Sequence, residues 1–183
     1  RLGAELAKEK DIDADFIVPV PDSGVPAAIG YAEKSNKKFE LGLIRNHYVG
    51  RTFIEPTQNI RSLGVKLKLN QTKTFVKNKT IILIDDSLVR GTTCYKIVRM
   101  LYESGAKKVH VRIACPEIKY PDFYGVDMPT KEELLAYKKN NEEMRDYIKA
   151  ESLEFLSLDG LYNALIGEKR NSNYPQFSDH YFT

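Results

Sequence analysis

The chain has 183 residues, enough for one domain with a substantial core; 42% of them are hydrophobic and 29% are charged. This composition is typical of a soluble globular protein, and no apolar run approaches the roughly 20 residues that a membrane-spanning helix needs. The net charge of +3 is too small to indicate a nucleic-acid-binding surface. The two cysteines, Cys94 and Cys115, fit neither a metal site nor a disulfide framework, so we expect a protein of the reducing cytoplasm with no membrane or nucleic-acid partner.

Short apolar runs alternate with helical patterns along the chain. From the N-terminus, the expected elements are helix 1–8, strand 15–20, helix 25–35, strand 41–44, strand 81–84, helix 93–103, strand 109–114, helices 131–138 and 141–150, strand 153–156 and helix 158–166. The run 81–84 is apolar on both faces, as in a central parallel strand, whereas 109–114 alternates between apolar and polar residues. The order predicts an α/β fold with a mostly parallel sheet flanked by helices.

Three features concern the organisation of the chain. The connection 45–79 is unusually long for a compact domain, and such connections are typical of active-site lids or contain small elements of their own. The chain begins at Arg1, inside what reads as a helix already under way, so we expect 1–183 to be a single domain from a longer protein. The polar segment 169–183 is expected to be a loosely held tail.

The segment 81–93 carries the strongest chemical signal. Its apolar strand ends in the adjacent acids Asp85 and Asp86, and a short loop with Gly91, Thr92 and Thr93 then leads into a helix. Glycine lets the backbone approach a ligand, and the free N–H groups of the helix favour an anion. Adjacent carboxylates repel each other, and they suit ribose hydroxyls or a hard cation such as Mg²⁺. Together these features predict a site for a phosphorylated sugar. The structural alternative is a plain strand–turn–helix without a ligand, with Thr93 as N-cap and the acids in a solvated turn.

The same residues resemble a known family signature. Segment 82–93, ILIDDSLVRGTT, resembles the 5-phosphoribosyl-1-pyrophosphate (PRPP) signature of the type I phosphoribosyltransferases. Segment 20–24, VPDSG, resembles the family's pyrophosphate loop, 45–54, RNHYVGRTFI, resembles its flexible loop, and 124–129, YGVDMP, matches a further segment. The matches cover nearly the whole chain in order, and the residues of these motifs are most similar to those of the branch that uses ammonia from glutamine.

The resemblance implies roles for particular residues. Asp85 and Asp86 would hold the ribose hydroxyls and Mg²⁺, with Ser23 as a third residue of the metal site. A non-proline cis bond is expected at the Asp22–Ser23 peptide, which would aim backbone groups at pyrophosphate. Lys68 is chosen from a basic run over 61–79 as a residue that meets a polyanion. The full set expected to bind PRPP is Asp22, Ser23, Arg45, Lys68, Asp85, Asp86, Ser87, Val89, Arg90, Gly91, Thr92 and Thr93.

The flexible-loop match at 45–54 suggests a lid. Gly50 would act as a hinge, and in the family this segment closes over PRPP and helps to form an ammonia channel. We expect Tyr48 and Ile54 to line that channel and to count, with Asp85 and Asp86, among the residues that carry catalysis. An exposed loop with aromatic side chains tucked onto the body is the structural alternative.

The resemblance also implies an activity and its partners. The expected reaction transfers the phosphoribosyl group of PRPP to ammonia, giving 5-phosphoribosylamine and pyrophosphate in the first step of purine biosynthesis. Ammonia would come from an N-terminal glutaminase domain that these 183 residues do not include, so we expect no use of glutamine by them alone. Purine nucleotides are expected as inhibitors, and the protein is expected to be a homo-oligomer. One branch of the family holds an iron–sulfur cluster, but Asp122 stands where that branch has a cysteine, so no cluster is expected.

Three other functions remain open at this level. A phosphoribosyltransferase fold can sense PRPP or nucleotides without catalysis, and a salvage enzyme would transfer the phosphoribosyl group to a purine or pyrimidine base. A receiver-type phosphoacceptor that uses Asp85 or Asp86 is disfavoured by the Gly-Thr-Thr loop directly after them.

Overall fold

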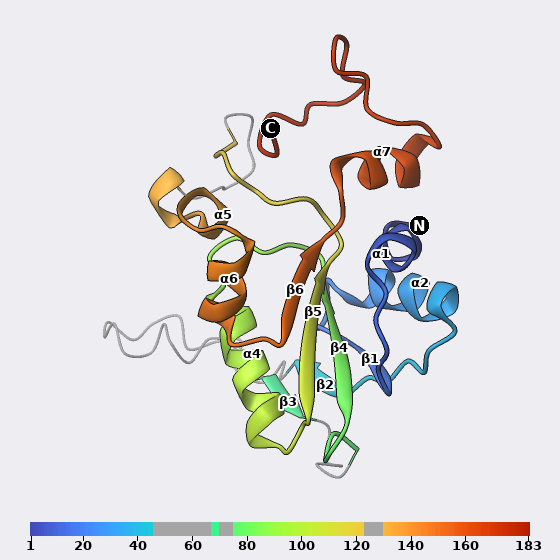
Figure 1. Ribbon diagram of the computed structural model, residues 1–183, viewed down its shortest axis with the longest axis vertical. Helices are drawn as coiled ribbons and strands as arrows, with labels where there is room; N and C mark the ends of the chain where they lie inside the picture. Colours follow the sequence, from blue (N-terminus) through green and yellow to red (C-terminus); the bar gives the residue numbers. More distant parts are fainter. Residues whose placement is uncertain (46–66, 70–74, 123–129) are drawn as a thin grey trace.

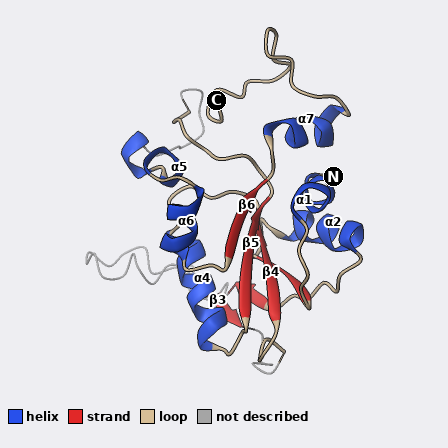
Figure 2. Ribbon diagram, viewed as in Figure 1, coloured by secondary structure: helices blue, strands red, loops and turns tan. Residues whose placement is uncertain are grey.

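The computed structural model describes residues 1–45, 67–69, 75–122 and 130–183. Its centre is a sheet of four parallel strands in the order β1-β4-β5-β6, as Figures 1 and 2 show. The four strands are β1 (Phe16–Pro19), β4 (Thr80–Asp85), β5 (Lys108–Ile113) and β6 (Ser152–Phe155). This arrangement confirms the predicted α/β class with its parallel sheet.

Helices cover both faces of the sheet (Figure 1). One face carries α1 (Leu2–Lys10), α2 (Val25–Ser35) and α7 (Leu158–Ile166), and the other carries α4 (Thr92–Glu103), α5 (Leu135–Lys138) and α6 (Asn141–Ile148). A short 3₁₀ helix, η2 (Lys131–Glu133), precedes α5.

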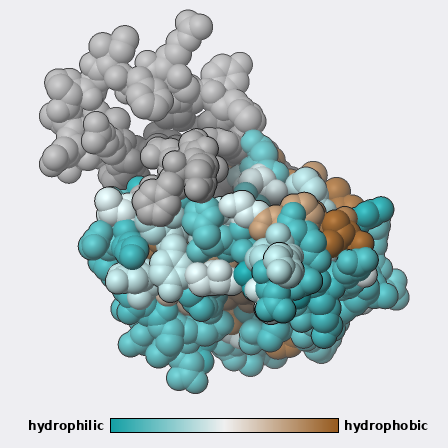
Figure 3. Space-filling model, turned by 90° about the horizontal axis from the view of Figure 1, so that it is seen from above, coloured by the Kyte–Doolittle hydropathy of each residue, from teal (hydrophilic) through white to brown (hydrophobic). Residues whose placement is uncertain are grey.

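Strand β4 joins the two halves of the core. Ile81 and Leu83 are buried among the side chains of the α4 face, and Ile82 and Ile84 among those of the α1–α2 face. Successive side chains of a strand point to opposite faces, so a strand between two helical layers buries the side chains of both faces and is typically apolar throughout. The surface seen in Figure 3 is mostly hydrophilic where residues are described.

Strand β5 departs from its sequence pattern. Apolar and polar residues alternate along it, but the polar His110 and Arg112 are only 4% and 3% exposed. Arg112 donates from Nε to the Lys10 carbonyl at 2.7 Å and from Nη1 to Ser152 Oγ at 2.9 Å, and His110 Nδ1 lies 2.8 Å from the same hydroxyl. The polar side chains are therefore buried with partners, which offsets the cost of removing them from water.

A second sheet pairs the strand before the long connection with one inside it. Strands β2 (Leu43–Arg45) and β3 (Leu67–Leu69) pair antiparallel, so the strand expected at 41–44 does not join the parallel sheet. The rest of the connection, 46–66 and 70–74, lies outside the described residues.

The C-terminal segment folds back against α7. Residues 171–178 are exposed, but Asp179 is 7% exposed and accepts hydrogen bonds from Tyr162 Oη at 2.8 Å and from Arg170 Nε at 2.5 Å. That the tail is loosely held stays a prediction, and the hydrogen bonds of Asp179 attach it to the body near its end. Within the described ranges, no helix has the length and apolar character needed to cross a bilayer.

Candidate functional site

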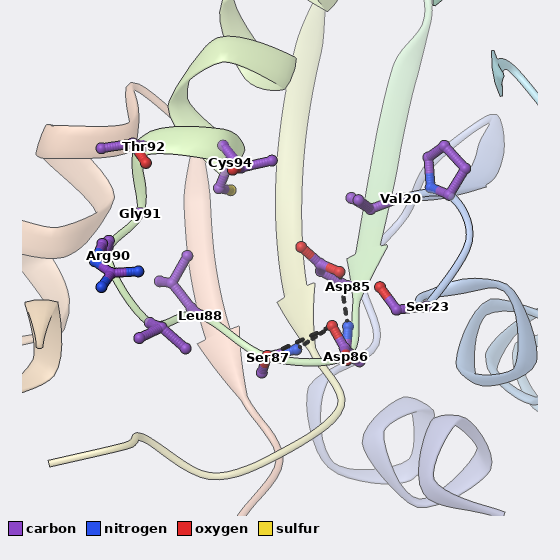
Figure 4. Close-up of a pocket in the computed structure, with 13 residues that line it drawn as sticks. Val20, Ser23, Asp85, Asp86, Ser87, Leu88, Arg90, Gly91, Thr92 and Cys94 are labelled. Carbon is purple, nitrogen blue, oxygen red and sulfur yellow. Dashed lines mark hydrogen bonds between the residues drawn. The ribbon is translucent and has the colours of Figure 1, made fainter. Parts of the chain in front are cut away.

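A cavity of about 330 Å³ opens at the carboxyl ends of β1 and β4 (Figure 4). Ligands of parallel sheets gather at this edge. The segment after β1 is held against β4, because Val20 N–H donates to the Ile84 carbonyl at 2.8 Å. The cavity is lined by Val20, Pro21, Ser23, Asp85, Asp86, Ser87, Leu88, Val89, Arg90, Gly91, Thr92, Thr93 and Cys94.

The loop after β1 contains the expected non-proline cis bond, but one residue earlier than predicted. The cis peptide joins Pro21 to Asp22 and not Asp22 to Ser23. The sequence resemblance locates the cis bond only to within one residue, because the local backbone geometry determines which peptide adopts the cis form. Gly24 follows, and a Cβ atom there would lie 2.4 Å from the Ile84 carbonyl oxygen, so only glycine allows this close approach to β4.

The adjacent acids are linked through the backbone. Asp85 Oδ1 accepts the Asp86 N–H at 2.9 Å, and Asp86 Oδ1 accepts the Ser87 N–H at 2.8 Å (Figure 4). Asp86 is exposed, whereas Asp85 is 8% exposed. Burial, reinforced by Asp86, raises the pKa of Asp85 to about 8, while the Ser23 side chain acts in the opposite direction. A cation or a hydroxyl-bearing ligand at this place would relieve the cost of the buried charge.

The oxygen atoms of this corner suit Mg²⁺. Figure 4 shows Ser23 beside Asp85 and Asp86, and magnesium prefers one or two carboxylates together with water and substrate oxygens. Among the described residues no group of three or more histidine, cysteine or acidic side chains could enclose a metal ion, so an ion here would need ligands beyond the protein. The donor set therefore fits a metal that arrives with a phosphorylated substrate.

The loop from β4 to α4 forms the other end of the cavity. Gly91 is the N-cap of α4 with φ 74°, and no side chain caps the helix, so the alternative of Thr93 as N-cap is wrong. The first backbone bond of the helix runs from Tyr95 N–H to the Gly91 carbonyl at 2.9 Å. The N–H groups of Thr92, Thr93 and Cys94 precede it, as in anion sites at helix N-termini.

Two segments from the second half of the chain support this loop from behind. Leu135 N–H donates to the Val89 carbonyl at 2.8 Å, and Arg90 Nε donates to Glu133 Oε2 at 2.6 Å. A Cβ atom on Gly91 would lie 2.7 Å from Leu135 Cδ2 and 3.0 Å from Tyr147 Cε1. The apolar pattern of 131–138 signals burial of Leu135, but nothing in the sequence says that it is buried against this loop.

The structure brings most of the expected site residues together. Ser23, Asp85, Asp86, Ser87, Val89, Arg90, Gly91, Thr92 and Thr93 line one cavity. Asp22 is exposed in the adjoining loop and does not line the cavity. Arg45 and Lys68 lie on the paired strands β2 and β3, where their backbone alone is described. Tyr48 and Ile54 lie outside the described residues.

Four lining residues were not expected. Val20 and Pro21 extend from the end of β1, Leu88 is buried in the loop, and Cys94 lies in the first turn of α4. The position of Val20 and Pro21 between a strand and the expected Ser23 was the available signal. Cys94 is buried, which raises the pKa of its thiol, so this cysteine packs as an apolar side chain.

The parallel sheet, the acid pair at the end of its central strand and the glycine loop that follows define a type I phosphoribosyltransferase fold. The glutamine phosphoribosylpyrophosphate (PRPP) amidotransferase from B. subtilis, solved in complex with ADP and GMP, superimposes with a TM-score of 0.80 at 49% identity. That match covers 94% of this chain and 38% of the other. A second structure, of the allosteric regulatory enzyme of purine biosynthesis, gives a TM-score of 0.81 at 48% identity.

Curated relatives narrow the class further. The amidophosphoribosyltransferase of Rhizobium etli is 57% identical over all 183 residues, and the chloroplastic amidophosphoribosyltransferase of Glycine max is 51% identical over 181 residues. Over its whole length the chain matches one part of the amidophosphoribosyltransferases. It spans 37% and 32% of the length of these two relatives. No family model matches the chain.

Proposed function

We propose that the cavity binds PRPP and transfers its phosphoribosyl group to ammonia, giving 5-phosphoribosylamine and pyrophosphate. The observation that carries the proposal is the presence, in one cavity, of two adjacent acids, of which Asp85 is buried, and an uncapped helix N-terminus. These two features suit the two ends of a ribose 5-phosphate. Over its full length, such a protein would take the ammonia from glutamine and catalyse the first step of purine biosynthesis.

The residues of the chain would divide the work. The loop 87–93 and the first N–H groups of α4 would hold the 5-phosphate, and Asp85 and Asp86 would hold the ribose hydroxyls. Asp85, Asp86 and Ser23 would hold Mg²⁺, which neutralises charge on the departing pyrophosphate. Asp22, Arg45 and Lys68 would contact the pyrophosphate side of the substrate. In the reaction the bond from ribose C1 to pyrophosphate oxygen breaks, a C1–N bond forms, and ammonia loses a proton.

Other parts of the proposal concern what surrounds the cavity. Tyr48 and Ile54 would cover the bound substrate and line the path of ammonia, which keeps water from the electron-poor sugar. Purine nucleotides would inhibit, because they carry the same phosphorylated ribose as the substrate; the B. subtilis relative was solved with ADP and GMP. We further propose a single domain over 1–183, a glutaminase partner domain, a homo-oligomeric assembly and no iron–sulfur cluster.

The test is pyrophosphate release from PRPP with an ammonium salt, with and without Mg²⁺. Asp85→Asn and Asp86→Asn should each lower the rate by at least about 100-fold, because they remove charge that contacts the reacting sugar. Asp159→Asn is the matched control, since Asp159 is a half-exposed acid on α7 paired with Lys169. Full activity in both site variants would overturn the assignment.

The same assay separates the rival functions. Binding of PRPP without pyrophosphate release would indicate a sensor. Turnover with a purine or pyrimidine base in place of ammonium would indicate a salvage enzyme.

A further inference from the structure

Arg90 is the one positively charged side chain among the described residues that line the cavity. Figure 4 shows it at the end of the cavity opposite Asp85 and Asp86, next to Gly91 and Thr92. Its Nε donates to Glu133 Oε2 at 2.6 Å, and its Nη atoms make no hydrogen bond to a described residue. The pair thus uses the inner nitrogen of the guanidinium and leaves the terminal nitrogens for a ligand.

We propose that Glu133 is a positioning residue for phosphate recognition. By accepting the hydrogen bond from Nε, it holds the guanidinium of Arg90 in the orientation in which the terminal nitrogens meet the 5-phosphate of the substrate. The proposal rests on the proposed function, because it concerns how the same cavity recognises PRPP. It assigns a task to a residue that does not line the cavity and lies 43 positions further along the chain.

Glu133 is itself held firmly enough for this task. It ends the 3₁₀ helix η2, and its N–H donates to the Thr130 carbonyl at 2.9 Å. The next residue, Leu134, is fully buried, and Leu135 N–H donates to the Val89 carbonyl at 2.8 Å. The backbone that carries Glu133 and the loop that carries Arg90 are therefore joined at neighbouring residues, and the ion pair continues a backbone contact.

The exposure of the pair argues against a role in stability. The side chains of Arg90 and Glu133 are 55% and 49% exposed, and ion pairs in such surroundings contribute little to folding. An arginine free in solvent samples many rotamers, and a ligand that uses it must restrict them at its own expense. A bond to Nε restricts the guanidinium before the ligand arrives. The opposing effect is that the negative charge of Glu133 weakens the attraction of Arg90 for phosphate.

Two substitutions at Glu133 separate orientation from charge. Glu133→Ala removes the acceptor and the charge, whereas Glu133→Gln removes the charge and keeps an oxygen that can accept the bond from Nε. We expect Glu133→Ala to raise the KM for PRPP about three- to tenfold with kcat within about twofold, as lost orientation of one charged contact predicts. Glu133→Gln should stay within about twofold of wild type in both constants.

Further variants show whether the effect passes through Arg90. In an Arg90→Gln background, Glu133→Ala should add nothing to the KM, because the group it orients is gone. Glu132→Ala is the matched control, an exposed neighbour in the same short helix with no hydrogen bond or ion pair to the described loop 87–93, and should behave as wild type. Thermal melting of each variant should lie within about 2 °C of wild type, since the pair is exposed.

The outcomes are distinct. A lower KM in both Glu133→Ala and Glu133→Gln would show that the carboxylate opposes phosphate binding and would overturn the proposal. So would an unchanged KM in Glu133→Ala, or a rise of equal size with Arg90 already replaced. A wild-type chain that neither binds PRPP nor releases pyrophosphate would refute the proposed function itself, whereas a wild type that turns over while Glu133→Ala matches it refutes this inference alone.

Discussion

Two glycines provide a controlled test of how the second half of the chain supports the loop 87–93. Gly91, at the start of α4, has φ +74°, and Gly167, at the end of α7, has φ +77°. A Cβ atom on Gly91 would lie 2.7 Å from Leu135 Cδ2 and 3.0 Å from Tyr147 Cε1, whereas a Cβ atom on Gly167 would meet nothing within 4 Å. Alanine at the two positions therefore shares one backbone cost and differs in packing.

The expected magnitudes follow from these surroundings. Alanine in the left-handed region costs about 1–2 kcal/mol, of which about 0.4–1 kcal/mol is offset because alanine restricts the unfolded chain. Gly167→Ala should thus lower the free energy of unfolding by about 1 kcal/mol. Gly91→Ala has the same backbone cost and, in addition, an overpacking cost of about 1–3 kcal/mol. We expect a value near the lower end of this range, because Leu135 Cδ2 is the tip of a flexible side chain. We expect Gly91→Ala to destabilise by about 2–3 kcal/mol.

The assay is equilibrium urea unfolding, followed by circular dichroism, with the KM for PRPP measured on the folded variants. Gly91→Ala should also raise that KM, because the loop must move away from Leu135, whereas Gly167→Ala should leave it unchanged. Adding Leu135→Ala to Gly91→Ala should recover part of the KM by making room. Equal destabilisation by the two alanines would refute the packing argument, since it would mean that nothing behind the loop resists a methyl group.

Two further predictions concern buried polar groups away from the cavity. Burial, aided by the charge of Arg112, lowers the pKa of His110 below its ordinary 6.5, so its contribution to stability is complete above pH 6.5 and is lost as the pH falls below that value. The urea midpoint should therefore drop less between pH 7.5 and pH 5.5 in His110→Gln than in wild type. Equal drops in the two proteins would contradict the assignment. Asp179→Asn removes the charged partner of Arg170 near the C-terminus and should speed tryptic cleavage after Arg170. The free energy of unfolding should drop by about 1.5–3 kcal/mol at most. Cleavage at the wild-type rate would show that Asp179 does not hold the tail.

Elements with strong local signals could be predicted from the sequence. Helix α7 begins and ends where expected, because the Ser157 hydroxyl accepts the Gly160 N–H at its start and Gly167 adopts a left-handed conformation at its end. Strand β4 was identified for a similar reason, since a run that is apolar on both faces fits only the middle of a covered sheet. The prediction of a ligand site at the acid pair and its loop rested on the same strand, because ligands gather where such strands end.

Features that depend on distant partners could not be predicted. The strand expected at 41–44 carries no sign that its partner is β3 in a separate antiparallel sheet. The alternating pattern of β5 gave no sign that its polar residues are buried, because their partners, the Lys10 carbonyl and Ser152, come from other elements. The contact of Glu133 with Arg90 joins residues 43 positions apart and leaves no local pattern. In each case a tertiary contact decides what propensity and periodicity leave open.

The acid pair shows how structure changes the weight of a sequence argument. Adjacent carboxylates repel each other, yet Asp85 and Asp86 each accept the N–H of the following residue. That turn does not need a charge, because an asparagine oxygen would accept the same bond. Burial raises the pKa of Asp85 from 3.8 to about 8, so at neutral pH folding must either bury its charge or take up a proton, and asparagine would avoid that free-energy cost. The turn therefore explains an Asx residue at position 85 but not the acid, and the proposed ligand, which would pair with its charge, accounts for the acid.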